Sequence, residues 1–190
     1  MLSLIKPDQE SLDSWLGRLS QVDFNYVEVG LTRGDVQPKG YHVDRHAVQL
    51  GLGEEAYQRA LGAFRGLNMW NFPWMEMVTR DKSMRLGTEL ATLTQQMGVW
   101  FLMPCRIVNM IDEKNRIGFA FGTLTGHVEQ GEERFLIERR QDDSVWYDII
   151  SVSRPRHWLA MLGYPYTRWL QGRFWRDSMQ AMVNAVSKFE

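Results

Sequence analysis

The first part of the chain carries apolar residues at helical spacing. After Pro7, Asp8 can cap a helix, and the apolar positions that follow lie on one helical face: Leu12, Trp15, Leu16 and Leu19. We therefore expect an amphipathic helix within residues 1–20, packed on or near the rest of the protein.

Helical spacing returns after Pro155 and continues to the C-terminus. Gly163 and Pro165 interrupt it, so we expect the long final helix to begin near Tyr166. Its predicted apolar side carries Leu170, Phe174, Ala181, Ala185 and Phe189.

The region between these helices changes its period along the chain. Residues 24–34 alternate apolar and polar positions and predict a first strand, while residues 41–53 and 54–68 predict two short helices. From residue 69 onward the period is 2. We expect antiparallel strands at 69–79, 87–96, 100–111, 116–124, 133–140 and 144–153, separated by turn sequences.

This order of elements predicts an α+β protein with the helix-grip (START-like) fold. In such a fold a curved antiparallel sheet wraps around the long C-terminal helix and tends to leave a cavity between them. The two short helices follow the first strand, and the N-terminal helix is an addition. At 190 residues the chain is expected to form one domain over 1–190.

Composition narrows the choice of function classes. A net charge of −1 gives no reason to expect nucleic acid as a partner. The single cysteine, Cys105, excludes an intramolecular disulfide, and no Cys/His pattern suggests zinc. No signal peptide and no apolar run long enough to span a membrane is visible, so we expect a cytoplasmic protein. The 8 Trp and 11 Met residues supply bulky apolar side chains for a core or a pocket.

Several motifs of the chain resemble those of one known family. They are NYVEVG (25–30), CRIV (105–108), GFAFGTLTGH (118–127), GEERF (131–135), SVWYDI (144–149) and SRPRHWLA (153–160). Together they resemble a bacterial and plant family described as a domain of unknown function, of the DUF1990 type, within the START and birch-pollen-allergen-like helix-grip superfamily. The chain departs from the family pattern at Thr125 and Val128, where proline is usual.

The resemblance implies a fold more firmly than an activity. Relatives with the helix-grip fold include lipid and sterol carriers, hormone receptors, polyketide cyclases and small-molecule hydrolases. Fold alone does not choose among these functions.

The stretch from Gly118 to Phe135 holds the main candidates for chemistry. His127 and Glu133 are the candidate catalytic acid/base pair, since a loop at the mouth of a cavity could present them. Together with Glu129 and Glu132 they could also form an ordinary solvated hairpin loop, and their spacing matches no metal-ligand motif. We expect no metal site.

One face of the strand at 116–124 is bare, because Gly118, Ala120 and Gly122 alternate with larger residues. A neighbouring side chain or a ligand could fill that face. Arg106 interrupts an apolar run, so it is either ion-paired internally or placed to bind an anionic group of a ligand. The other candidate ligand-binding residues are Trp70, Trp74, Trp100, Phe119, Phe121, Trp146 and Phe174.

Gly51, Gly53 and Ala56 form the pattern GxGxxA of dinucleotide-binding sites. Because they follow a predicted helix and precede two glutamates, we interpret them as a helix break and expect no cofactor.

The leading hypothesis is that the protein binds a small apolar or amphipathic molecule in the cavity between the sheet and the C-terminal helix. An alternative is an enzyme of cyclase, dehydratase or hydrolase type in the same cavity. A second alternative is a module that binds a protein partner through the N-terminal helix. Polar groups that converge inside the cavity would favour an enzyme over a carrier.

Overall fold

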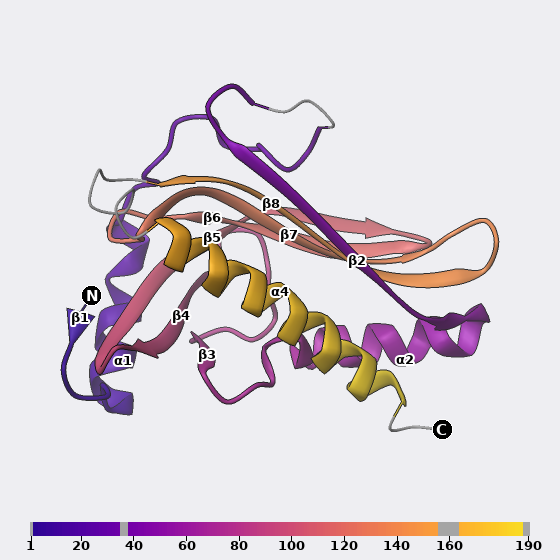
Figure 1. The fold of residues 1–190 in the computed structure, drawn as a ribbon, viewed down its shortest axis with the longest axis horizontal. Helices are drawn as coiled ribbons and strands as arrows, with labels where there is room; N and C mark the ends of the chain where they lie inside the picture. Colours follow the sequence, from indigo (N-terminus) through magenta and orange to yellow (C-terminus); the bar gives the residue numbers. More distant parts are fainter. Residues whose placement is uncertain (1, 35–37, 156–163, 188–190) are drawn as a thin grey trace.

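The computed structural model of the protein describes residues 2–34, 38–155 and 164–187. The helical elements in this part of the chain are α1 (Gln9–Gly17), the 3-10 turns η1 (Leu19–Gln21) and η2 (Asn68–Trp70), α2 (Gly53–Arg65) and α4 (Tyr164–Ser187). The strands are β1 (Leu2–Ser3), β2 (His42–Leu52), β3 (Met75–Thr79), β4 (Glu89–Gln96), β5 (Val99–Glu113), β6 (Arg116–Thr123), β7 (Glu129–Arg139) and β8 (Ser144–Pro155). Figure 1 shows their arrangement.

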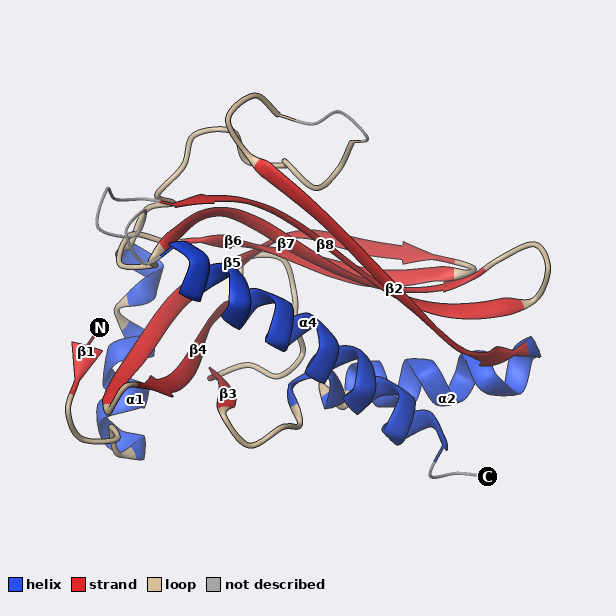
Figure 2. Ribbon diagram, in the orientation of Figure 1, coloured by secondary structure: helices blue, strands red, loops and turns tan. Residues whose placement is uncertain are grey.

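The strands form one antiparallel sheet in the order β2-β8-β7-β6-β5-β4-β3, and β1 pairs with β5. The sheet curves over α4, which runs beneath it across the strands, and α2 covers one end of the same face (Figures 1 and 2). We call this face, which α2 and α4 cover, the inner face. The helix-grip fold predicted from the order of elements is confirmed.

The inner face holds the main apolar core. Phe135 of β7 lies at its centre and is fully buried, and its ring contacts the rings of Trp70, Phe119, Phe121 and Phe174 at centroid distances of 5.0–6.3 Å. Aromatic contacts of this kind add to the stabilisation that comes from burial itself. The core therefore joins η2, two strands and α4.

The opposite, outer face carries a second apolar cluster. Leu12, Leu16 and Leu19 of α1 and η1 pack on it against Ala91, Leu93, Leu102 and Leu124. The helix α1 begins as predicted, because the Asp8 carboxylate accepts a hydrogen bond from the backbone N–H of Ser11 (2.8 Å). Apolar side chains thus cover both faces of the sheet at its β4–β5 end.

Residues 24–34 form a loop on the outer face, so the strand predicted there is wrong. Phe24 makes one isolated bridge to Leu124, and beyond it the segment turns to the carboxylate of Glu132. That carboxylate accepts hydrogen bonds from the Tyr26 hydroxyl (2.8 Å), the Gly30 N–H (2.5 Å), and the N–H and hydroxyl of Thr32 (3.1 Å each). The polar groups of the loop therefore bond to one buried side chain instead of a sheet ladder.

Gly122 makes this arrangement possible. A Cβ atom at this position would lie 2.1 Å from the Tyr26 hydroxyl oxygen. The bare face of β6 is therefore occupied at Gly122 by a tyrosine of the protein itself, which is the first of the two possibilities considered for it.

Residues 42–52 form the edge strand β2, so the short helix predicted over 41–53 is also wrong. β2 pairs with β8 along its whole length. Its inward positions at one end are the polar residues Asp44 and His46, and for this reason the sequence shows no clear alternation of apolar and polar positions. The helix predicted over 54–68 is present as α2, followed by η2.

The GxGxxA pattern begins at the end of this strand and continues into α2, so it does not follow a helix. Gly51 lies at an irregularity in the β2–β8 register, where a Cβ atom would be 2.7 Å from the Cβ of Ala56. Gly53 opens α2 with φ +79°. The neighbouring strand is antiparallel, so the βαβ unit of a dinucleotide site is not formed here.

The remaining strand predictions are confirmed with changed ends. β4, β5, β6 and β8 lie within a few residues of their predicted bounds, whereas β3 begins only at Met75 and β7 begins earlier, at Glu129. The long helix begins at Tyr164, close to the predicted start. The helical spacing predicted over 156–163 and the position of Phe189 lie outside the described residues. No helix in the described ranges is long and apolar enough to cross a membrane.

Candidate functional site

The segment GEERF belongs to the strand β7, so the interpretation of its glutamates as a solvated loop is wrong. Along a strand, side chains alternate between the two faces. Glu132 lies on the outer face, where it binds the 24–34 loop, while Glu129 and Glu133 lie on the inner face opposite α4. Two carboxylates therefore lie on the inner face, between the sheet and α4.

Glu133 is held by the C-terminal helix. Its Oε1 accepts a hydrogen bond from the indole N–H of Trp175 in α4 (3.1 Å). Burial raises the pKa of Glu133 to about 8, the nearby Glu129 adds to the rise, and the indole hydrogen bond opposes it. The side chain nevertheless keeps part of its surface accessible, so protein does not seal it completely.

Glu129 lies nearer the start of α4. Its Oε1 accepts a hydrogen bond from the side-chain amide of Gln171 (2.7 Å), and Gln171 also lies 3.5 Å from the hydroxyl of Ser153. Burial raises the pKa of Glu129 to about 7, although the Gln171 hydrogen bond and the charge of Arg168 lower it. Like Glu133, Glu129 is half-buried.

The edge strand β2 completes this polar group. Asp44 accepts two hydrogen bonds from the guanidinium of Arg168, both at 2.7 Å, which ties β2 to α4. The ring of His46 stacks on Trp175 with centroids 4.2 Å apart, and burial lowers the pKa of His46. The Nε2 atom of His46 is buried and has no hydrogen-bond partner.

These residues divide the inner face into two halves. The polar half is defined by Asp44, His46, Glu129, Glu133, Arg168, Gln171 and Trp175. The apolar half, under the later turns of α4, carries Val48, Leu50, Ile137, Tyr147 and Ile149. There the Tyr147 hydroxyl bonds to that of Ser178 (2.9 Å). Across residues 2–34, 38–155 and 164–187, no group of three or more His, Cys, Asp or Glu side chains is arranged to hold a metal ion.

Four of the predicted ligand-binding residues lie in the core of the inner face: Trp70, Phe119, Phe121 and Phe174. The thiol of Cys105 is also buried there, and burial raises its pKa, which keeps it protonated and inert.

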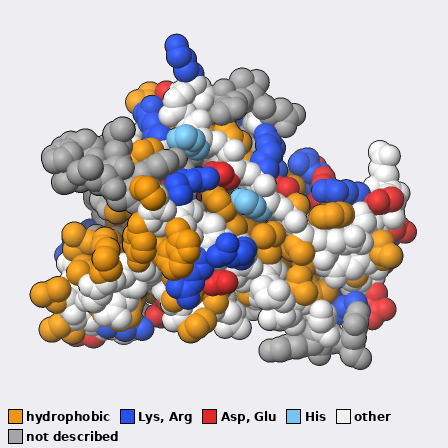
Figure 3. Space-filling model, viewed as in Figure 1, with side chains coloured by type: hydrophobic (Ala, Val, Ile, Leu, Met, Phe, Trp, Pro, Cys, Tyr) orange, Lys and Arg blue, Asp and Glu red, His pale blue; other side chains and the backbone are white. Residues whose placement is uncertain are grey.

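Trp74 comes just before β3, the edge strand, and Trp100 lies in β5, paired with β1 and β4. The indole of Trp74 donates to Asp177 of α4 (2.7 Å), while Trp100 packs with the outer cluster. Both line a surface pocket of about 270 Å³ that also includes Lys6. Leu4, Ile5 and Met97 are exposed apolar side chains. Apolar side chains gather on the surface at the end of the molecule that carries β1, α1 and β4 (Figure 3).

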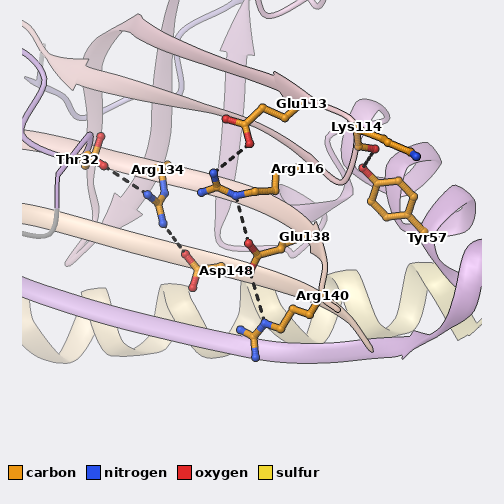
Figure 4. A network of polar contacts seen from close by, with 9 residues as sticks. All are labelled: Thr32, Tyr57, Glu113, Lys114, Arg116, Arg134, Glu138, Arg140 and Asp148. Carbon is orange, nitrogen blue, oxygen red and sulfur yellow. Dashed lines mark hydrogen bonds and ion pairs between the residues drawn. The ribbon is translucent and has the colours of Figure 1, made fainter. Parts of the chain in front are cut away.

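Trp146 lies on the outer face of β8, beneath the guanidinium of Arg140 (4.2 Å to the ring centroid). The structure therefore does not bring it to the inner face. Around it the outer face of β6–β8 carries paired charges: Arg116 bonds to Glu113 and Glu138, and Arg134 bonds to Asp148 (Figure 4).

His127 lies in the turn between β6 and β7. Its Nδ1 accepts a hydrogen bond from the backbone N–H of Glu129 (3.0 Å), so the ring helps to shape the turn that starts β7. The two residues of the predicted acid/base pair therefore lie in different places. His127 is in the turn, and Glu133 is on the inner face.

Arg106 has internal partners on the outer face. Its Nη2 donates to the carbonyl oxygens of Leu19 (2.6 Å) and Val22 (3.1 Å), and its Nε lies 3.4 Å from Glu89 Oε1. These contacts are those of an internally paired arginine, which was the first of the two interpretations of this residue.

We expect the change Arg106→Leu to lower the free energy of unfolding by about 1–2 kcal/mol, because two carbonyls and a carboxylate lose a charged donor that is only partly exposed. Denaturant unfolding measures this change. Arg85→Leu is the control, since its pair with Asp81 is largely exposed, and it should leave the stability nearly unchanged. Equal effects of the two changes would contradict the structural role of Arg106.

The sequence did not identify most residues of the polar half. Asp44 and His46 were hidden by the wrong prediction of a helix at 41–53, and their alternation along a strand is the signal that could have shown them. Gln171 and Trp175 carry no motif, and only the packing of α4 on β7 brings them to the glutamates.

Comparisons with known proteins agree with this fold. Residues 25–181 match the family model described as domain of unknown function (DUF1990). The chain is 30% identical to a UPF0548 protein of Dictyostelium discoideum over 98% of this chain and 96% of that protein.

Solved structures show the same fold at low identity. Ara h 8.0201 superposes with a TM-score of 0.53 at 12% identity, over 78% of this chain and 99% of the other. Norcoclaurine synthase from Thalictrum flavum, solved with dopamine and hydroxybenzaldehyde, gives a TM-score of 0.50 at 13% identity over 87% and 95% of the two chains.

Proposed function

We propose that this chain, which belongs to the family described as domain of unknown function DUF1990, binds a small amphipathic molecule between its sheet and the first turns of α4. The observation that carries the proposal is Glu133. Glu133 is a partly accessible residue on the inner face, beside aromatic side chains. Its carboxylate accepts a hydrogen bond from Trp175 of α4, the helix that covers this face.

The surroundings of Glu133 suit a ligand with two chemical ends. Towards the apolar half lie the rings of Phe121, Phe135 and Phe174, which would contact an apolar group. Towards β2 lie Glu129, Gln171 and His46, which offer polar contacts. A few polar groups at the edge of an aromatic lining are typical of sites for small molecules.

The shared fold is consistent with this class of function. Norcoclaurine synthase, which has the same fold, was solved with two small aromatic molecules. At 13% identity the comparison supports the architecture only, so the identity of a ligand has to come from the residues of this chain.

A second candidate function is acid/base catalysis in the same place. A general acid or base works best with a pKa near the operating pH, and the pKa values of Glu129 and Glu133, about 7 and about 8, meet this condition. A cyclase, dehydratase or hydrolase would use Glu133 to transfer a proton while Glu129 holds the opposite protonation state. His127, in the turn that leads into β7, stays a candidate for this chemistry.

The third hypothesis, a protein partner on the N-terminal helix, has less support. Leu12 and Leu16 are buried on the sheet of the same chain, so the apolar face of α1 already has a partner.

We expect the neutral dye N-phenyl-1-naphthylamine to bind the wild-type protein saturably, and Ser151→Phe to weaken that binding at least tenfold. Ser151 lies across the β7–β8 ladder from Glu133, so a phenyl ring there would fill the proposed site. Fluorescence titration measures binding, and a thermal scan of the same samples measures stability.

Gln180→Phe, on the exposed side of α4, is the control and should bind the dye as the wild type does. In a completely filled interior, Ser151→Phe would instead lower stability by about 1–3 kcal/mol through overpacking, and the wild type would not bind the dye. That result would refute the proposed function.

A further inference from the structure

We infer that the polar half of the inner face receives a protonated amine, so that the ligand is a small molecule with an ammonium group next to an apolar body. This inference rests on the proposed function, because it specifies the ligand of the same site. It follows from the hydrogen-bond and ion-pair partners of the carboxylates, which differ between the two faces of the sheet.

On the inner face the two glutamates have only neutral donors. In the part of the chain that the structure describes, Glu129 accepts from the amide of Gln171 and Glu133 accepts from the indole of Trp175. Each carboxylate uses its Oε1 atom for this bond. The Oε2 atoms are not among the buried unpartnered atoms, so they face accessible space.

The guanidinium of Arg168, on the same side of the sheet, is already engaged. It binds Asp44 through two hydrogen bonds and donates a third, of 2.8 Å, to Gln171. Among the described residues of the polar half, three carboxylates thus share this one cationic side chain, Arg168. With all three ionised, the polar half would carry an excess of negative charge, which either protonation of the glutamates or a further cation relieves.

Carboxylates on the outer face of the same strands are treated differently. Glu138 pairs with Arg116 and Arg140, and Asp148 pairs with Arg134 (Figure 4). Glu132 has four donors from the 24–34 loop. These carboxylates have cations or several donors as partners, whereas among the described residues Glu129 and Glu133 have no ion pair and one neutral side-chain donor each.

His46 gives a second and independent indication of a ligand. Its Nε2 atom is buried without a partner, although the ring is fixed by stacking on Trp175. Buried polar atoms are nearly always satisfied in proteins, and at this position beside the candidate site a bound molecule can provide the partner.

An ammonium group fits these atoms. It offers three N–H donors, which is enough for the free oxygens of the two glutamates and one further acceptor. A ligand anion would instead meet two carboxylates, which disfavours fatty acids and phosphate esters at this end. The aromatic rings near Glu133 would contact the apolar body.

Binding of a cation here should release protons near neutral pH. The ammonium favours the ionised form of Glu129 and Glu133, so affinity should rise with pH from 6 to 8. The other titratable or charged groups of the described residues that act on them are Asp44 of β2, Cys105 of β5, Tyr147 of β8 and Arg168 of α4. His46 of β2 lies next to them, stacked on Trp175.

Three probes of one shape test the inference by isothermal titration calorimetry at pH 7.5: 2-phenylethylamine, 2-phenylethanol and 3-phenylpropanoate. We expect the amine to bind the wild type about tenfold or more tightly than the alcohol, with the acid weakest. Titrations in two buffers of different ionisation enthalpy should show protons released with the amine only.

In the Glu133→Gln variant the preference for the amine over the alcohol should fall to about threefold or less. Glu129→Gln provides the same test from the other carboxyl. Glu138→Gln, on the outer face of the same strand, should keep the full preference.

Equal affinity of the wild type for amine and alcohol would overturn the inference and leave the proposed function standing. Failure of all three probes to bind would overturn it too, and titration with the naphthylamine dye would then decide separately whether the site binds small molecules at all.

Discussion

Glu132→Ala should lower the free energy of unfolding by about 3–5 kcal/mol, the largest effect of any change considered for this protein. The substitution removes one carboxylate and leaves four donors of the 24–34 loop without an acceptor: the Tyr26 hydroxyl, the Gly30 N–H, and both donors of Thr32. Tyr26 cannot compensate as an anion, since burial, which does not depend on Glu132, raises its pKa above the ordinary value of 10. Equilibrium unfolding in urea measures the loss.

Glu138→Ala is the matched control, because it lies on the same face of the same strand but pairs with Arg116 near solvent. It should cost no more than about 1 kcal/mol. Tyr26→Phe should fall between the two, at about 1 kcal/mol, since it removes a single donor. If Glu132→Ala proved no worse than Glu138→Ala, the loop would not depend on this carboxylate.

The stability of the protein without ligand should fall by about 2–3 kcal/mol between pH 6.5 and pH 8. Folding raises the pKa of Glu129 to about 7 and that of Glu133 to about 8, from an ordinary value of 4.5. The folded protein therefore holds protons that the unfolded chain has lost. Each group stabilises the folded state fully below pH 4.5, and this stabilisation disappears as pH rises through its folded pKa.

The choice of pH window avoids an opposing effect. Burial lowers the pKa of His46 below its ordinary value of 6.5, which makes stability rise with pH below that value. Above pH 6.5 the two glutamates act alone among these three groups. Urea midpoints at pH 6.5, 7, 7.5 and 8 measure the slope.

The variant Glu133→Gln cannot ionise at this position, so its stability should change little between pH 7 and pH 8. The free energy of unfolding of the variant, relative to that of the wild type, should therefore increase as pH rises. A wild-type profile as flat as that of the variant would show that Glu133 titrates near its ordinary value, which would also weaken the case for acid/base catalysis.

Much of the fold could be predicted from the sequence because its signals are local. The Asp8 cap, the apolar face of α1 and the alternation in β4–β6 and β8 depend on neighbouring residues only. Residues 24–34 alternate like a strand but lie in a loop, since their polar partner is Glu132, about a hundred residues later in the chain.

The candidate site was predictable only in part. Glu133 was identified by its residue type, but whether a strand residue faces inward depends on register, which the sequence leaves open. For the same reason the sequence does not show that Trp100 and Trp146 lie on the outer face. A strand position one residue earlier or later would point to the inner face. The partners Gln171 and Trp175 come from long-range packing, for which a single sequence gives no signal.

The apolar cluster under α1 determines where a fragment of this protein can begin and still fold. The family match begins at residue 25, yet Leu12, Leu16 and Leu19 cover Ala91, Leu93 and Leu102 on the sheet, and carbonyls at 19 and 22 bind Arg106. A fragment starting at residue 25 would keep every residue of the proposed site but expose a continuous apolar strip across two strands. Strips of that kind promote aggregation, so expression boundaries taken from the family match alone would give an insoluble protein.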